Sequence, residues 1–174
     1  MLKGLKPILV PFSRFLTTYL ALVFLYQIYL NAYKENGLDP LSRKIAWCTS
    51  EIINTTNHYT SQLVDQKEYE GVWFFINGKY TTRMVEGCNA VSIIILFIAF
   101  IFAFYKGYTT FIFVGIGIIL IYLINIARIV ALNLIARSLP AYSKIAHDYF
   151  FPAIIYGTVV ILWIIWIHYF ASTK

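Results

Sequence analysis

The sequence predicts an all-α integral membrane protein in which four transmembrane helices hold a small extracytoplasmic loop region, made of a short helix and a β-hairpin. Of its 174 residues, 60% are hydrophobic and only 13% are charged, whereas about a quarter of the residues in a soluble domain are charged. The apolar residues also gather into four runs that approach the roughly 20 residues needed to cross a bilayer. A soluble globular protein is therefore excluded as the first interpretation.

The four apolar runs define the predicted spans. The third run holds one charged residue, Arg128, and the fourth begins near Pro152, which suits a first helical turn because its missing N–H group costs nothing there. The first run follows a basic segment, but it is longer than the apolar part of a signal peptide and no small-residue cleavage site follows it. We therefore expect a retained anchor. The predicted spans cover residues 8–30, 89–105, 109–136 and 150–170.

Lysine and arginine residues in short loops set the orientation of a membrane protein. With both termini in the cytoplasm, the short inner stretches hold a dense set of cations, and the other loop cations are spread over two longer outer loops. We therefore predict a protein of the inner membrane with cytoplasmic termini and with residues 32–87 outside. The inner cations are Lys3, Lys6, Arg14, Lys106 and Lys174.

Residues 32–87 form the only sizeable segment outside the predicted spans. Asp39-Pro40 matches a helix cap followed by a first-turn proline, and apolar residues follow at helical spacing. Asn77-Gly78 between two β-prone runs predicts a hairpin with a type I′ turn. The chain thus divides into a basic segment with the first helix (1–31), the extracytoplasmic region (32–87) and a membrane core with the other three helices (88–174), where we place the candidate catalytic residues.

Composition also excludes several classes of function. The net charge is +6, but the basic residues form no stripe or patch of the kind that binds nucleic-acid phosphates. Two cysteines, Cys48 and Cys88, are too few for a disulfide framework or a four-ligand zinc site. We expect no nucleic-acid partner, no metal and no cofactor.

Arg128 is the residue least expected in a membrane span. A charged side chain there is costly, so it usually faces a cavity or a partner and marks function. The alternative is an arginine that extends toward the outer end of its helix. Asn125 lies three residues earlier and shares the helix face of Arg128, which favours a polar pocket over a lone charge.

Cys88 and His147 are both predicted at outer ends of helices, at similar depth. A helix N-terminus favours a thiolate, so Cys88 is a candidate nucleophile, with an inert buried cysteine as the alternative. His168 is placed near the inner face. We expect Asp148 to cap the fourth helix, and orienting His147 is its alternative role. A thiolate, an imidazole and the Arg128 guanidinium would suffice for acyl transfer.

Three separated motifs are Glu86-Gly-Cys-Asn-Ala at the start of one span, Asn125-Ile-Ala-Arg-Ile-Val within the next, and Ala146-His at the start of the last. In this order, on one side of the membrane, they resemble the exosortase/archaeosortase family of membrane cysteine transpeptidases. With the Ile-Asn-Gly-Lys-Tyr lead-in to the cysteine, the layout is most similar to the short F-type exosortases of Gram-negative bacteria.

The resemblance implies a membrane-embedded sorting transpeptidase. Such an enzyme cleaves the C-terminal tail of exported proteins, which consists of a recognition motif, a transmembrane helix and a basic cluster. It does so through a cysteine thioester and transfers the protein to water, a membrane lipid or a glycan-linked amine. Carried over, Cys88 is the nucleophile, Arg128 the cation that stabilises the oxyanion or orients the substrate, and His147 the general acid/base. The supporting residues are expected to be Glu86, Asn125 and Asp148.

This sequence departs from the family in two respects. Many members have more than four spans, and many carry Ser-Gly after the cysteine where this chain has Asn89-Ala90.

The main alternative function is a non-enzymatic four-helix membrane assembly or export factor, whose polar pocket serves packing or partner binding. A quinone-linked thiol oxidoreductase would need a close cysteine pair, and the two cysteines lie 40 positions apart. A serine intramembrane protease would need a Ser/His arrangement in the spans, and Ser92 has no histidine on its helix.

Overall fold

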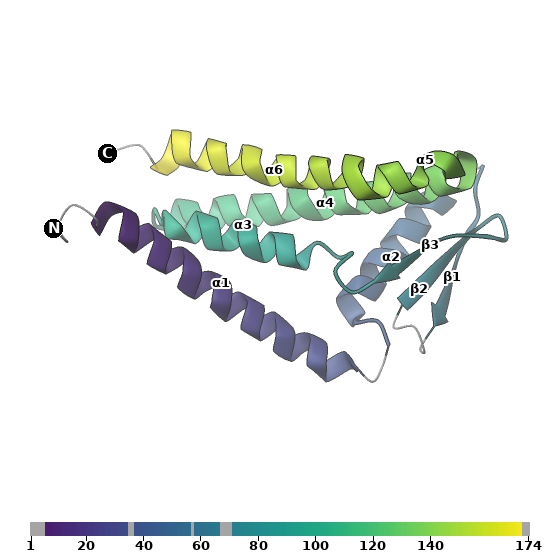
Figure 1. The fold of residues 1–174 in the computed structure, drawn as a ribbon, viewed down its shortest axis with the longest axis horizontal. Coiled ribbons are helices and arrows are strands. Elements are labelled where there is room, and N and C mark those ends of the chain that lie inside the picture. The colour runs from purple at the N-terminus through teal and green to yellow at the C-terminus, as the bar shows by residue number, and fades with distance from the viewer. Residues whose placement is uncertain (1–5, 35–36, 57, 67–70, 172–174) are drawn as a thin grey trace.

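The computed structural model of the chain describes residues 6–34, 37–56, 58–66 and 71–171. Figure 1 shows a bundle of long helices that carries a small sheet and one further helix at one end. The bundle consists of α1 (Lys6–Tyr33), α3 (Val91–Ala103), α4 (Tyr108–Ser138) and a continuous helix made of α5 (Pro140–Ile145), η4 (Ala146–Phe150), α6 (Phe151–Ile165) and η5 (Trp166–Ala171). The end of the bundle carries α2 (Pro40–Asn54) and the strands β1 (Ser61–Gln66), β2 (Gly71–Ile76) and β3 (Lys79–Val85).

Three of the described helices are long and apolar enough to cross a membrane, and α3 is a shorter apolar helix. With 13 residues, α3 is about 20 Å long at 1.5 Å per residue, although the sequence predicted a span over 89–105. The helix begins late because Ala90 takes a left-handed backbone with φ of 59°. The prediction of four full-length spans is therefore confirmed for three. These three cover Ile8–Tyr33, Tyr108–Ser138 and Pro140–Phe170.

The last helix begins at Pro140 and not near residue 150, so the predicted start of the fourth helix was wrong and His147 lies within the helix. Leu139, with φ of −137° and ψ of 61°, separates α4 from α5, and Pro140 starts the new helix with its fixed φ. The helix widens to a π turn at Ala146–Phe150, where the Phe151 N–H group donates to the Ala146 carbonyl. Pro152 lies in the first turn of α6 as predicted, but α6 continues an existing helix. Because Pro152 has no N–H group to donate, it favours this interruption of the regular pattern.

The predicted hairpin is confirmed, and a third strand extends it. The strands pair antiparallel in the order β1-β2-β3, and Asn77 and Gly78 both take the positive φ of a type I′ turn (50° and 74°). Strand β3 holds one extra residue, Thr81, where the register shifts opposite Phe74. The Thr81 hydroxyl donates to the Phe74 carbonyl (3.1 Å) and to Asn133 Oδ1 of α4 (2.7 Å). The bulge thereby ties the sheet to the C-terminal end of α4.

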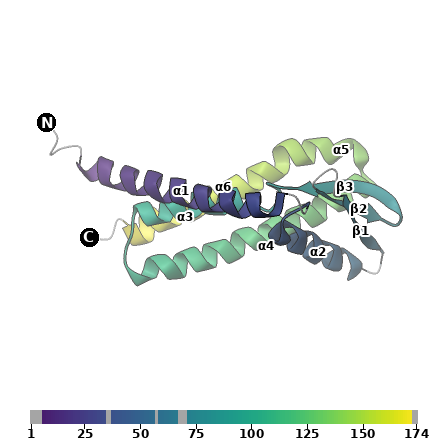
Figure 2. The same cartoon turned by 90° about the horizontal axis from the view of Figure 1, so that it is seen from below.

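The helix predicted after Asp39-Pro40 is α2, and the Asp39 carboxylate accepts from the Ser42 N–H group (3.0 Å) as a cap. A core between α2, the sheet and α4 contains Ile45, Phe74 and Ile129. In Figure 2, α1 runs along α3, and none of the most apolar stretch of α1 is buried in the protein, as expected for a helix that faces lipid. The first turn of α1 and the last turn of η5 lie at one end of the bundle, and the sheet and α5 lie at the other (Figure 1).

Candidate active site

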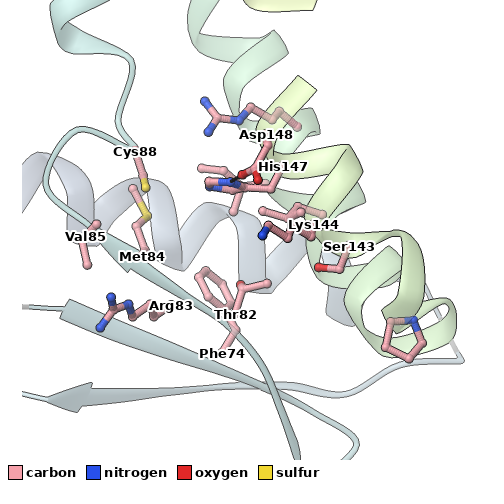
Figure 3. Close-up of a pocket in the computed structure, with 14 residues that line it drawn as sticks. Phe74, Thr82, Arg83, Met84, Val85, Cys88, Ser143, Lys144, His147 and Asp148 are labelled. Carbon is pink, nitrogen blue, oxygen red and sulfur yellow. Dashed lines mark hydrogen bonds and ion pairs between the residues drawn. The ribbon is translucent and has the colours of Figure 1, made fainter. Parts of the chain in front are cut away.

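A cavity of about 580 Å³ opens between β3, the segment that precedes α3, the C-terminal half of α4, and the α5–η4 segment. Cys88, Arg128 and His147 all contribute to its lining. Figure 3 shows Cys88 and His147 on opposite walls of this cavity. The structure thus brings these three residues to one cavity, and their chemical roles remain predictions.

Cys88 lies in a turn that joins β3 to α3. Its N–H group donates to the Val85 carbonyl (3.1 Å), and Gly87 and Ala90 on either side have positive φ angles of 86° and 59°. Because α3 begins only at Val91, Cys88 lies outside the first helical turn, where the effect of a helix dipole is concentrated. The sequence argument that placed the thiol at a helix start therefore applies less strongly than expected. Cys88 is a free, partly buried thiol.

Asn125 holds the Cys88 turn from the side of α4. Its side chain is fully buried, and its Nδ2 donates to the Cys88 carbonyl at 2.9 Å. Its Oδ1 is buried without a hydrogen-bond partner among the described residues. The supporting role expected for Asn125 thus has a concrete basis, because this contact sets where the backbone of Cys88 lies.

Arg128 lines the cavity one helical turn beyond Asn125. Within the described part of the chain, its Nε is buried and has no hydrogen-bond partner. No carboxylate or carbonyl of the described residues accepts from this donor, so the protein leaves it unpaired. This placement favours the pocket interpretation of Arg128 over an arginine that extends toward the headgroups.

His147 projects from the π turn, and its Nδ1 lies 2.8 Å from Asp148 Oδ1. The pair is about half exposed, at 54% and 41% of the two side chains. Asp148 was expected to cap the fourth helix, and this expectation was wrong, because the helix starts earlier and its described turns have no side-chain cap there. Asp148 instead contacts the imidazole, which fixes Nδ1 and leaves Nε2 for other partners.

The other predicted residues lie outside the cavity lining. Glu86 is exposed in the turn before Cys88, so its supporting role stays a prediction. Cys48 is part of α2, where its sulfur accepts from the Tyr122 hydroxyl at 4.0 Å. His168 lies in η5, at the opposite end of the last helix, as expected. Among the described residues, no cluster of three metal-ligating side chains is found.

Sequence reasoning missed several polar residues of the cavity wall. Lys144 precedes His147 by three residues on the same helix, so helical spacing could have found it if the helix had been predicted to begin at Pro140. Arg83 and Thr82 come from β3. Their position in the cavity wall follows from the bulge at Thr81, which no local sequence pattern predicts. Lys144, Arg83 and Arg128 give the cavity more cationic than anionic side chains.

A membrane bundle that presents a free thiol, an imidazole and a guanidinium to one cavity has the groups needed for acyl transfer within a membrane. The sequence model of the transmembrane exosortase family (Exosortase_EpsH) matches residues 2–170, and the chain therefore belongs to this family. Exosortases are cysteine transpeptidases, so family membership implies a membrane sorting transpeptidase. Comparisons with curated proteins and with solved structures gave no match.

Proposed function

We propose that this exosortase cleaves the C-terminal sorting tail of exported proteins through a thioester on Cys88. The observation that supports this most is the meeting of Cys88, Arg128 and His147 at one cavity, although they come from three separate segments of the chain. Nothing in helix packing alone requires a thiol, an imidazole and an unengaged guanidinium in the same place.

In the proposed first half-reaction, the Cys88 thiolate attacks the carbonyl carbon of the scissile peptide bond and a C–S bond forms. The Arg128 guanidinium stabilises the negative charge on the carbonyl oxygen. His147, oriented by Asp148, donates a proton to the departing amine, so the C–N bond breaks and the tail leaves as a free amine. The exported protein then remains on Cys88 as a thioester.

In the second half-reaction, an acceptor nucleophile attacks the thioester carbonyl. His147 now takes the proton of that nucleophile as a general base, the C–S bond breaks, and Cys88 returns to a thiolate. Water as acceptor releases the protein, and an amine on a membrane lipid or on a glycan-linked group attaches it. The reaction sequence is the same for each acceptor.

The substrates of this proposal are exported proteins with a recognition motif, a transmembrane helix and a basic cluster at the C-terminus. The enzyme lies in the inner membrane with both termini in the cytoplasm, and its cavity faces outward. The proposal also assigns the chain to the short F-type exosortases, and the Ile-Asn-Gly-Lys-Tyr lead-in to the cysteine supports this assignment. In this proposal the chain is divided into a first helix (1–31), an extracytoplasmic region (32–87) and a catalytic core (88–174).

The test is processing of a cognate tailed protein in intact cells, followed by a gel shift, with the acyl-enzyme trapped and identified by mass. Cys88→Ala is expected to abolish processing, and Cys88→Ser to be nearly as damaging because a hydroxyl is far less acidic than a thiol. Arg128→Lys is expected to fail, since lysine keeps the charge but loses the planar fork with two donors. Cys48→Ala and His168→Ala are the matched controls and are expected to process normally. Full activity of Cys88→Ala would instead support the non-enzymatic assembly factor.

A further inference from the structure

The residue after the nucleophile, Asn89, is 1% exposed and uses its whole amide group. Its Nδ2 donates to the Tyr26 hydroxyl of α1 (2.8 Å) and to Ser42 Oγ of α2 (2.8 Å). Its Oδ1 accepts from the N–H group of Val91, the first residue of α3 (3.0 Å). A buried amide with both of its donors and its acceptor engaged is held in one orientation.

The backbone around Asn89 needs such support. Ala90 takes φ of 59°, a left-handed conformation that is unfavourable for a residue with a Cβ atom. Such a conformation persists only where the surrounding structure enforces it. The hydrogen bond from Val91 to Asn89 Oδ1 bridges Ala90 and therefore enforces it directly.

Cys88 consequently lies between two buried asparagines with different anchors. Asn125 of α4 holds the Cys88 carbonyl (2.9 Å), and Asn89 fixes the next residue to Tyr26 and Ser42. Asn89 is not among the residues that line the cavity, so it acts through Cys88 and does not touch the reacting atoms.

We propose that Asn89 is a positioning residue for the transpeptidation, and that its bond to Tyr26 makes α1 part of the support of the nucleophile. The inference rests on the proposed function for its effect on turnover. It changes the view of α1 from a membrane anchor to a helix that helps to set the direction of the thiol. The loss of either the Asn89 amide or the Tyr26 hydroxyl releases the same turn.

The test is a double-mutant cycle with Asn89→Ala and Tyr26→Phe, measured as kcat and KM per folded enzyme. Tyr26→Phe removes one hydroxyl and is expected to lower kcat about fivefold, the equivalent of one hydrogen bond. Asn89→Ala is expected to lower kcat by about tenfold or more, because misplacement of a reacting group by about 1 Å can cost 10²-fold. KM stays unchanged in both variants. The double variant is expected to be no slower than Asn89→Ala, because both changes break one network.

Tyr29→Phe is the matched control. Its hydroxyl also ties α1 to α2, through Asp39 (3.1 Å) and the Leu41 N–H group (3.2 Å), but it has no bond to the Cys88 turn. We expect Tyr29→Phe to lower the unfolding temperature and to leave kcat per folded enzyme unchanged. Additive effects of Tyr26→Phe and Asn89→Ala, or an unchanged kcat in both, would overturn the proposal.

A second readout does not depend on the reaction. In a Cys48→Ala background, well below the unfolding temperature, iodoacetamide is expected to alkylate Cys88 severalfold faster in Tyr26→Phe and Asn89→Ala, because the turn is released. A merely structural role would lower the amount of folded protein without this change. If Cys88→Ala proved active, the proposed function would fail, but the alkylation rates would still test whether Asn89 and Tyr26 position the thiol. Alkylation of Tyr26→Phe and Asn89→Ala at the same rate as Tyr29→Phe would overturn the positioning role.

Discussion

Replacement of Asn125 by leucine, a side chain of similar size, separates the support of the nucleophile from the stability of the fold. Asn125 is fully buried, with Nδ2 bonded to the Cys88 carbonyl and Oδ1 without a partner in the described chain. Loss of the hydrogen bond costs about 1 kcal/mol net, and a buried polar atom without a partner costs about 1–3 kcal/mol. Leucine removes both the favourable contact and the unfavourable atom. We therefore expect the free energy of unfolding to change by less than about 2 kcal/mol.

Turnover responds differently to this change. Without Asn125, nothing on α4 fixes the Cys88 carbonyl, and a displacement of the thiol by about 1 Å can lower the rate about 10²-fold. We expect Asn125→Leu to lower kcat per folded enzyme by about 10- to 100-fold. The assays are thermal unfolding of the purified protein in detergent and single-turnover processing of a tailed substrate.

Asn133→Leu is the contrasting variant on the same helix. Asn133 is also fully buried, but its Oδ1 accepts from Thr81 and Thr82 and its Nδ2 donates to the Ile129 carbonyl. Its replacement removes three hydrogen bonds and leaves the Thr82 hydroxyl without an acceptor, so we expect a loss of stability of about 2–4 kcal/mol. The reasoning on Asn125 would be refuted if Asn125→Leu turned over at the wild-type rate, or if it lost as much stability as Asn133→Leu.

Two further predictions concern the imidazole and the packing of the bundle. Asp148→Asn is expected to lower kcat about tenfold with little change in KM, because the carboxylate that fixes Nδ1 of His147 is lost; an unchanged kcat would show that Asp148 does not orient the ring. Gly117→Ala is expected to destabilise the protein by about 1–3 kcal/mol in thermal unfolding, because its new Cβ would overlap the buried Phe97 ring. Gly115→Ala on the same helix meets no atom within 4 Å and should not destabilise, so equal losses in both variants would contradict the packing argument.

The sequence predicted the parts of the fold that depend on local patterns. Long apolar runs gave the three membrane-length helices, and Asn77-Gly78 gave the hairpin, because each signal lies within a few residues of the structure it specifies. Strand β1 was missed because its sequence, SQLVDQ, is polar, and its pairing with β2 supplies the stabilisation. The start of the last helix was misplaced because Pro152 is as typical of a first turn as of a π interruption.

In the candidate site, too, the features that depend on local sequence could be predicted and those that depend on distant contacts could not. Arg128 and Cys88 could be selected from the sequence, since a charge in a span and a thiol next to a span are each unusual. The support of Cys88 could not be predicted, because Asn89 bonds to residues 47 and 63 positions away in the chain. Contacts at that separation depend on how α1, α2 and α3 pack, and no periodicity in the sequence encodes that packing.

The short helix α3 fixes how deep Cys88 lies relative to the surface of the bilayer. Asn125, which contacts the Cys88 carbonyl, lies 17 residues into α4 from Tyr108, so the backbone of Cys88 lies about 26 Å along that helix from its N-terminal end. A bilayer has a hydrocarbon core of about 30 Å. If one face of that core lies at the first residue of α4, the opposite face therefore lies beyond the level of Cys88. In such a membrane, water would reach the proposed thioester through the protein and not from open solution, and the lipid would have to thin around α3 at a cost that grows with bilayer thickness. Under the proposed function, bilayer thickness would therefore set how far the membrane helix of a substrate must extend before one of its peptide bonds meets Cys88.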